Sequence, residues 1–202
     1  MTSQPEIIQP EMIQPEMIQP GMIQAKNLPP QLDVLITDLR AATEDEAADE
    51  AIISILNRFV AAPDAADSIL PDFAEDDVVL FEDDTLSVWF CRFQPGATVP
   101  PHDHRIAATI AVVTGTEQND FFTADDEGRL IHSDSRAVTP GQVLHIPDDA
   151  IHSVSCVSDI PSTAIHVYQG ALTRIDRNLF DTDRNETLAY TDENYARLTK
   201  QS

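Results

Sequence analysis

The stretch "GATVPPHDHRIAATIAVVTG", residues 96–115, places two histidines one residue apart, ahead of an apolar run that ends in glycine. Alternate side chains of an extended strand point to the same face, so His102 and His104 face one way and Asp103 faces the other. Two imidazoles that converge in this way can bind one metal ion, but an exposed polar turn can carry the same pair without a ligand. The pair alone leaves both interpretations open.

A second stretch, "GQVLHIPDDAIHSVSC" at residues 141–156, favours the metal site. It contains a glycine, a proline six residues later and a histidine five residues beyond that, at Gly141, Pro147 and His152. The first stretch likewise has Gly96 six residues before His102. These spacings resemble the paired motifs of the cupin superfamily, G-x5-H-x-H and G-x5-P-x-G-x2-H. The resemblance covers roughly residues 76–170 and implies a double-stranded β-helix barrel.

The resemblance also implies a metal site made by three side chains: His102, His104 and His152. The Glu that usually follows the second histidine is absent, with Ala108 and Thr109 in its place, and the motif's second glycine is Asp149. The implied ligands are then three neutral imidazoles, which leave a divalent ion its full charge and up to three open positions. Glu117 is an alternative ligand, but it follows Gly115 in an expected turn, where a solvated side chain is the favoured interpretation.

A cupin with three histidine ligands is similar to the thiol dioxygenases, the cysteine and 3-mercaptopropionate dioxygenase group, which use non-haem Fe(II). That group carries a Ser-x-His-x-Tyr run on a later strand, and "STAIHVY" at 162–168 has His166 and Tyr168 at the same spacing. Ala164 replaces the serine. The resemblance implies that His166 orients the Tyr168 hydroxyl towards substrate or dioxygen. Both residues could instead be satisfied polar groups of the barrel core.

Three functions follow as hypotheses. The first is a non-haem iron dioxygenase that oxidises a small thiol to a sulfinate with dioxygen. The second is a cupin that binds a metal or ligand without turnover, and the third is a cupin enzyme that uses Zn, Mn or Ni, since histidines alone do not choose among these metals. The substrate-binding residues remain unknown. Cysteine dioxygenases hold the substrate carboxylate with an arginine on an early strand, which is missing here; Arg92 and Arg174 are candidates for this role, with surface ion pairs as the favoured interpretation of each. The substrate and the oligomeric state are left open.

The composition restricts the partners. The chain has 12 Lys and Arg against 35 Asp and Glu, a formal net charge of -23, so phosphate backbones and anionic membranes would be repelled. Two cysteines are too few for a disulfide framework, the first residues lack a secretory signal, and no apolar run approaches the roughly 20 residues that span a bilayer. A cytoplasmic protein with a small-molecule substrate is expected.

The remaining sequence predicts a mainly β fold with N-terminal helices. The segments are a disordered tail of proline-spaced repeats at 1–28, a helical segment at 29–70, the cupin barrel with a polar, irregular C-terminal extension at 71–190, and a C-terminal tail at 191–202. Thr43 and Glu46 have the spacing of a capping box for the second helix. Of the other histidines, His145 is expected inside the barrel near the metal and His132 on the surface.

Overall fold

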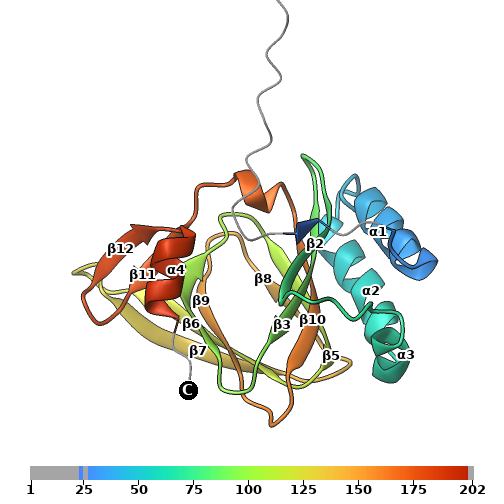
Figure 1. Cartoon of the computed structure of the whole chain (residues 1–202). Helices are drawn as coiled ribbons and strands as arrows, with labels where there is room; N and C mark the ends of the chain where they lie inside the picture. The colour runs from blue at the N-terminus through green and yellow to red at the C-terminus, as the bar shows by residue number, and fades with distance from the viewer. Residues whose placement is uncertain (1–22, 25–26, 200–202) are drawn as a thin grey trace, which may run out of the picture.

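The computed structural model describes residues 23–24 and 27–199 (Figure 1). The helices are α1 (Pro30–Ala42), α2 (Ala48–Val60), α3 (Pro63–Asp67) and α4 (Asp192–Leu198), with a 3-10 turn at Leu172–Arg174. The strands are β1 (Ile23–Gln24), β2 (Asp77–Glu82), β3 (Ser87–Phe93), β4 (Thr98–Asp103), β5 (Ala108–Thr114), β6 (Glu117–Ala124), β7 (Leu130–Val138), β8 (Val143–Ile146), β9 (Ile151–Cys156), β10 (Ser162–Tyr168), β11 (Asn178–Asp181) and β12 (Glu186–Ala189).

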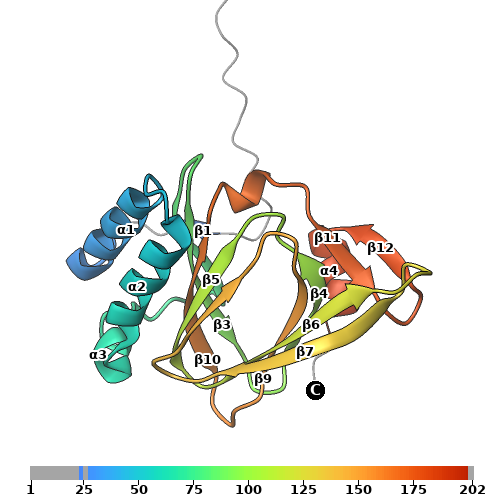
Figure 2. The ribbon, with the colours of Figure 1, turned by 180° about the vertical axis from the view of Figure 1, so that it is seen from behind.

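The strands form two six-stranded sheets that face each other as a barrel (Figures 1 and 2). The first sheet has the order β1-β2-β3-β10-β5-β8 and the second has the order β12-β11-β4-β9-β6-β7. Apart from the parallel pair β1–β2, all pairings are antiparallel. Chain neighbours such as β4 and β5 lie in opposite sheets. This arrangement confirms the mainly β barrel with N-terminal helices.

The N-terminal helices cover the outer face of the first sheet, as Figure 2 shows. Leucine and isoleucine recur every three or four residues in α1 and α2, and this apolar face packs on outward-facing side chains of the sheet. Along β10, Ile165 and Val167 belong to this outer cluster, whereas Ala164 and Tyr168 belong to the cluster inside the barrel. Strand alternation therefore directs His166, like Tyr168, into the barrel.

The ends of the chain differ from the expectation in part. The predicted repeat tail lies outside the described residues as far as residue 22, and Ile23–Gln24 form the edge strand β1. The C-terminal extension is not irregular: β11 and β12 form a hairpin that continues the second sheet beside β4, followed by α4. The capping box is also wrong, because α2 begins after Ala47 and Thr43 ends α1. Within the described chain, the helices are too short or too polar to cross a bilayer.

Candidate metal centre and adjoining cavity

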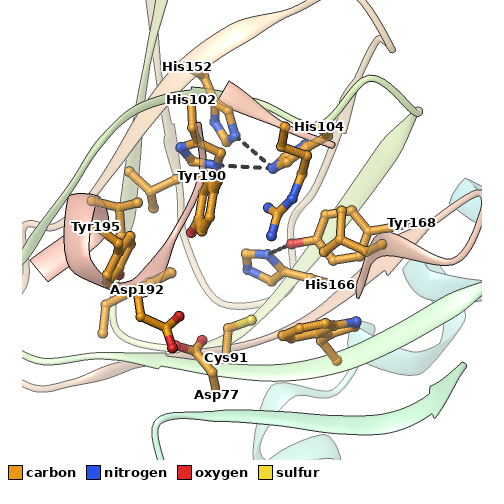
Figure 3. A pocket seen from close by; sticks show the side chains of 16 residues that line it. Asp77, Cys91, His102, His104, His152, His166, Tyr168, Tyr190, Asp192 and Tyr195 are labelled. Atoms are coloured by element: carbon orange, nitrogen blue, oxygen red, sulfur yellow. Dashed lines mark hydrogen bonds between the residues drawn. The ribbon is translucent and has the colours of Figure 1, made fainter. Parts of the chain in front are cut away.

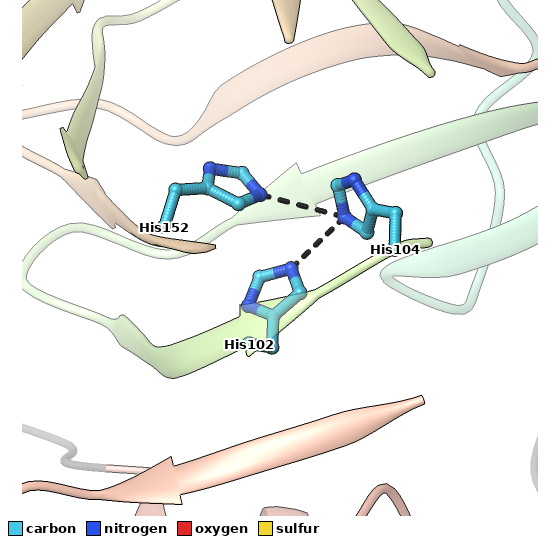
Figure 4. Close-up of side chains that lie close together, drawn as sticks. All are labelled: His102, His104 and His152. Carbon is cyan, nitrogen blue, oxygen red and sulfur yellow. Dashed lines mark hydrogen bonds between the residues drawn. The ribbon is translucent and has the colours of Figure 1, made fainter. Parts of the chain in front are cut away.

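Three histidines converge inside the barrel from strands far apart in the sequence (Figure 4). His102 lies on β4 directly opposite His152 on β9, and His104 follows at the end of β4. The Nε2 atom of His104 lies 3.0 Å from Nε2 of His102 and 3.4 Å from Nε2 of His152. All three residues are at most 5% exposed. The structure therefore brings together the three residues for which the resemblance implies metal binding.

Hydrogen bonds orient two of these rings. Nδ1 of His102 lies 2.9 Å from the Pro100 carbonyl oxygen, which can only accept, so this nitrogen carries the proton. Nδ1 of His152 donates in the same way to Oδ1 of Asn119 at 3.0 Å. Each ring consequently presents the lone pair of Nε2 to the centre of the cluster. This is the tautomer in which imidazole binds a metal through Nε2.

The cluster fits a divalent cation better than it fits a proton. Burial lowers the pKa of His102 to about 4 and lowers the pKa of His104 and His152 well below the usual range, and the neighbouring imidazoles lower them further. With Nε2 of His102 and His152 unprotonated, a proton on Nε2 of His104 can be donated to one of them, at 3.0 or 3.4 Å, and leaves the other lone pair without a donor, whereas a divalent cation accepts the lone pairs of all three rings. Among the described residues, no Asp, Glu or Cys joins the three histidines within metal-ligand spacing.

Glu117 corrects one expectation. Its side chain is not solvated but fully buried, because β6 begins at this residue and alternation turns Glu117 and Asn119 to the same inward face. Neither carboxylate oxygen has a hydrogen-bond partner. Oε2 lies 3.6 Å from Nε2 of His166, which is ion-pair distance and slightly beyond a hydrogen bond. Glu117 thus approaches the histidine of β10 and not the three-histidine cluster.

His166 and Tyr168 form a polar pair beside the cluster (Figure 3). Nδ1 of His166 lies 3.2 Å from the Tyr168 hydroxyl, and the Tyr168 ring packs edge-on against His104 with centroids 5.0 Å apart. Burial raises the pKa of Tyr168 well above its usual value, so the phenol stays protonated. The absent serine leaves Ala164 fully buried at the matching position. His166 of this pair therefore lies next to Glu117 of β6, whereas the motif's serine hydroxyl would lie on β10 itself.

One cavity of about 390 Å³ joins these groups. It is lined by all three clustered histidines, by His166 and Tyr168, and by aromatic side chains from β3 and the C-terminal segment: Trp89, Phe93, Tyr190 and Tyr195. Asp77 and Asp192 lie on the side of the cavity away from the three histidines (Figure 3). The cavity is the size of a small-molecule site and offers groups of both charges.

Arg177, which lines this cavity, was missed by the sequence analysis. Its side chain is 7% exposed and its guanidinium carbon lies 3.9 Å from the centroid of the Tyr190 ring. Arg92 and Arg174 form ion pairs outside the cavity with Asp76 and Asp84, as expected. No local pattern distinguishes Arg177, because it lies in a polar segment whose hairpin structure the sequence did not reveal.

The two remaining histidines lie away from the cluster. His132, on β7, is exposed as expected. His145 does not line the barrel interior near the cluster: Nδ1 bonds the Thr109 hydroxyl at 3.1 Å, and Nε2 lies 3.6 Å from Asp49 on α2. The expectation was wrong because β8 presents this position to the helical layer and not to the cavity.

No protein-family model matches the chain. Among solved structures, oxalate decarboxylase from Bacillus subtilis is 21% identical over 55% of this chain and 25% of its own, with a TM-score of 0.37. Oxalate oxidase is 26% identical over 43% and 42%, with a TM-score of 0.36. Peruvianin-I, a cysteine peptidase from Thevetia peruviana latex, is 17% identical over 47% and 55%, with a TM-score of 0.39. The chain spans a quarter of the length of the oxalate decarboxylase chain and about half that of Peruvianin-I.

Proposed function

We propose that the protein is a metal-dependent cupin oxygenase that converts a small thiol to a sulfinate with dioxygen. The observation that carries the proposal is the meeting, in one cavity, of the three-histidine cluster and the His166–Tyr168 pair. The reaction R–SH + O2 → R–SO2H places both oxygen atoms on sulfur, so it needs no external reductant. Fe(II) held by His102, His104 and His152 would supply adjacent positions for a thiolate and dioxygen.

In this proposal, the side chains beside the cluster accept the proton of the thiol. With the Nε2 proton of His166 directed at Glu117, Nδ1 accepts the hydrogen bond of the Tyr168 hydroxyl. The phenol oxygen then has a lone pair free for the S–H of an entering thiol. As that proton moves to Tyr168, the phenol proton moves to Nδ1 of His166, and the carboxylate of Glu117 stabilises the resulting imidazolium. The product ionises as sulfinate, and the proton is released to water.

Metal content is the first measurement. Protein purified without added metal should contain near-stoichiometric iron, and His152→Ala should lose it, because the variant removes one of three nitrogen ligands. His132→Ala is the matched control, since this exposed histidine lies on β7 outside the cavity. Stoichiometric zinc, manganese or nickel would contradict iron and favour a cupin enzyme with another metal. Absence of metal from the wild-type protein would contradict the metal centre.

Turnover is measured as thiol-dependent oxygen uptake, with the sulfinate identified by mass spectrometry. Iron-loaded wild-type protein should consume oxygen only with a small thiol present, and Tyr168→Phe should lower kcat by about 100-fold while iron content is unchanged. Uptake that survives in His152→Ala would contradict the proposal. Stoichiometric metal without uptake for any thiol would favour the non-catalytic alternative, which the replacement of the motif serine by Ala164 also favours.

A further inference from the structure

We propose that the outer edge of β2 is a docking site for the N-terminal pentapeptide repeat, and that the four repeat units of one chain compete for it. The units are PEIIQ at 5–9, PEMIQ at 10–14 and 15–19, and PGMIQ at 20–24. The first three lie outside the described residues. The last two residues of the fourth unit, Ile23 and Gln24, form β1, which pairs in parallel with β2 (Figure 2). This inference is independent of the proposed function.

Strand β2 needs a neighbour on this side. Its sequence, DVVLFE at 77–82, is rich in β-branched and aromatic residues, and Val78, Val79 and Leu80 are at most 5% exposed. Because β3 pairs with the other side of β2, removal of β1 would make β2 the edge strand of the first sheet. An apolar edge strand with open N–H and C=O groups pairs readily with other chains, so proteins cover or charge such edges.

The pairing of β2 with β3 identifies the backbone groups that face β1. The N–H of Arg92, on β3, donates to the carbonyl of Asp76 at 2.7 Å. Successive residues of an antiparallel strand direct these groups to opposite sides, so Val79, three residues on, directs its N–H and C=O away from β3 and towards β1. Its register partner on β1 is Gln24. Hydrogen exchange of the Val79 amide therefore measures whether a strand occupies this edge.

The other three units carry the same pair of residues as β1. Isoleucine followed by glutamine recurs at five-residue intervals, at 8–9, 13–14 and 18–19. A shift of the tail by one unit therefore brings an identical dipeptide to Val78 and Val79 and leaves the rest of the sheet in register. The connection between the docked unit and α1 grows from five residues to ten, which lowers the occupancy about 3-fold.

Two further arguments rank the occupants. Alanine follows Gln24, whereas proline, which has no N–H for a ladder, follows the glutamine of each other unit, so the fourth unit is preferred. A unit of the same chain is held near the edge by α1, which packs on the first sheet, at an effective concentration on the order of millimolar. A second copy of the chain, with its own net charge of -23, does not compete at micromolar concentration.

The test measures hydrogen exchange of the Val79 amide in the full-length protein, relative to the amide of Ile165 on the central strand β10. Proline, which disfavours a ladder, replaces isoleucine in the fourth unit alone, in the other three, or in all four. The substitutions are Ile8→Pro, Ile13→Pro, Ile18→Pro and Ile23→Pro. We expect the rate to rise about 10-fold in Ile23→Pro, because the third unit docks with a longer connection and one hydrogen bond fewer.

The triple variant is the matched control and should exchange within about 2-fold of the wild type, since the fourth unit is intact. The quadruple variant should exchange at least a further 10-fold faster than Ile23→Pro, because its edge is open. A loss of stability of the whole sheet would raise the Ile165 rate equally, so it does not pass for an open edge.

Equal rates in Ile23→Pro and the quadruple variant would overturn the inference, because the other units would then not reach the edge. A wild-type rate as fast as that of the quadruple variant would also overturn it. Unlabelled wild-type protein added to the isotope-labelled quadruple variant tests the second copy as occupant. Exchange that stays fast supports docking within one chain, and protection that returns at micromolar concentration overturns it.

Discussion

Among single residues, Glu117 is a buried carboxylate whose neighbours compensate little of the free energy that its burial costs. Its carboxylate is fully buried, neither oxygen accepts a hydrogen bond, and the nearest ionisable group is His166 at 3.6 Å. Burying a charge costs free energy that an ion pair at this distance recovers only in part. A residue of this kind is better explained by what it does to His166 than by a contribution to the stability of the fold.

Glu117→Gln tests that explanation. Because the change removes a buried charge and keeps the shape, the free energy of unfolding should stay within about 1 kcal/mol of wild type or rise. The rate of thiol oxidation should fall by about 10-fold, since a neutral amide stabilises the His166 imidazolium less. Thermal melts and oxygen uptake measure the two effects, with Glu186→Gln on the exposed face of β12 as control. A large loss of stability with an unchanged rate would assign Glu117 a structural role.

At the scale of elements, the turn between β5 and β6 decides which side chains enter the barrel. Here the chain leaves the first sheet and joins the second, and Gly115 makes the corner with φ +64°. A Cβ at Gly115 would lie 2.6 Å from Cα of Ser162 and 2.7 Å from the Pro161 carbonyl oxygen. The corner needs glycine for conformation and for space, and it sets the register that turns Glu117 inward.

Gly115→Ala should destabilise the protein by about 3 kcal/mol or more, since backbone atoms of the facing loop must move in addition to the cost of a left-handed residue. Gly128→Ala is the matched control: its φ is +77°, but the added Cβ would have no neighbour within 4 Å. The control should lose about 1 kcal/mol, from backbone conformation alone. Urea denaturation of the two variants measures the difference, and equal losses would show that the close approach costs nothing.

In the molecule as a whole, the three uncharged histidines of the cluster lie inside a protein with a large negative net charge. The formal net charge is -23, while the three clustered histidines are buried and uncharged. The unfolded chain protonates His102 below about pH 6.5, whereas burial lowers the pKa in the folded protein to about 4. Unfolding therefore takes up protons between these two values, and the free energy of unfolding falls as the pH falls through this window.

Metal-free protein should accordingly lose about 2 kcal/mol of stability per buried histidine between about pH 6.5 and pH 5, above the range in which most carboxyls titrate. Urea denaturation after treatment with a chelator measures this slope. His102→Gln should make it shallower by the share of one histidine, whereas the exposed His132→Gln should leave it unchanged. A slope that is identical in His102→Gln and wild type would mean that other groups control the acid sensitivity.

Local sequence patterns predict some of the side chains at the cavity and miss others. The spacing of His102 and His104 on one strand, and of His166 and Tyr168 on another, follows from strand alternation, so the sequence indicates which face each pair shares. Glu117 and Arg177 have no such signal. Glu117 reaches the barrel interior beside His166, and Arg177 reaches the cavity. Each does so through a turn or hairpin whose course depends on contacts with distant parts of the chain, which are Ser162 for Gly115 and Asp103 for Asn178.

The sequence by itself determined the mainly β class, the N-terminal helices and the shared face of His102 and His104, because periodicity and short spacings are properties of neighbouring residues. His152 was predicted only through the resemblance of two separate stretches to the paired cupin motifs. Tertiary structure alone decided that Glu117 is buried beside His166, that His145 faces α2, and that a C-terminal hairpin brings Arg177 to the cavity. These outcomes depend on the register between strands separated by tens of residues, and the free energy that selects a register is shared by the whole sheet and belongs to no local motif.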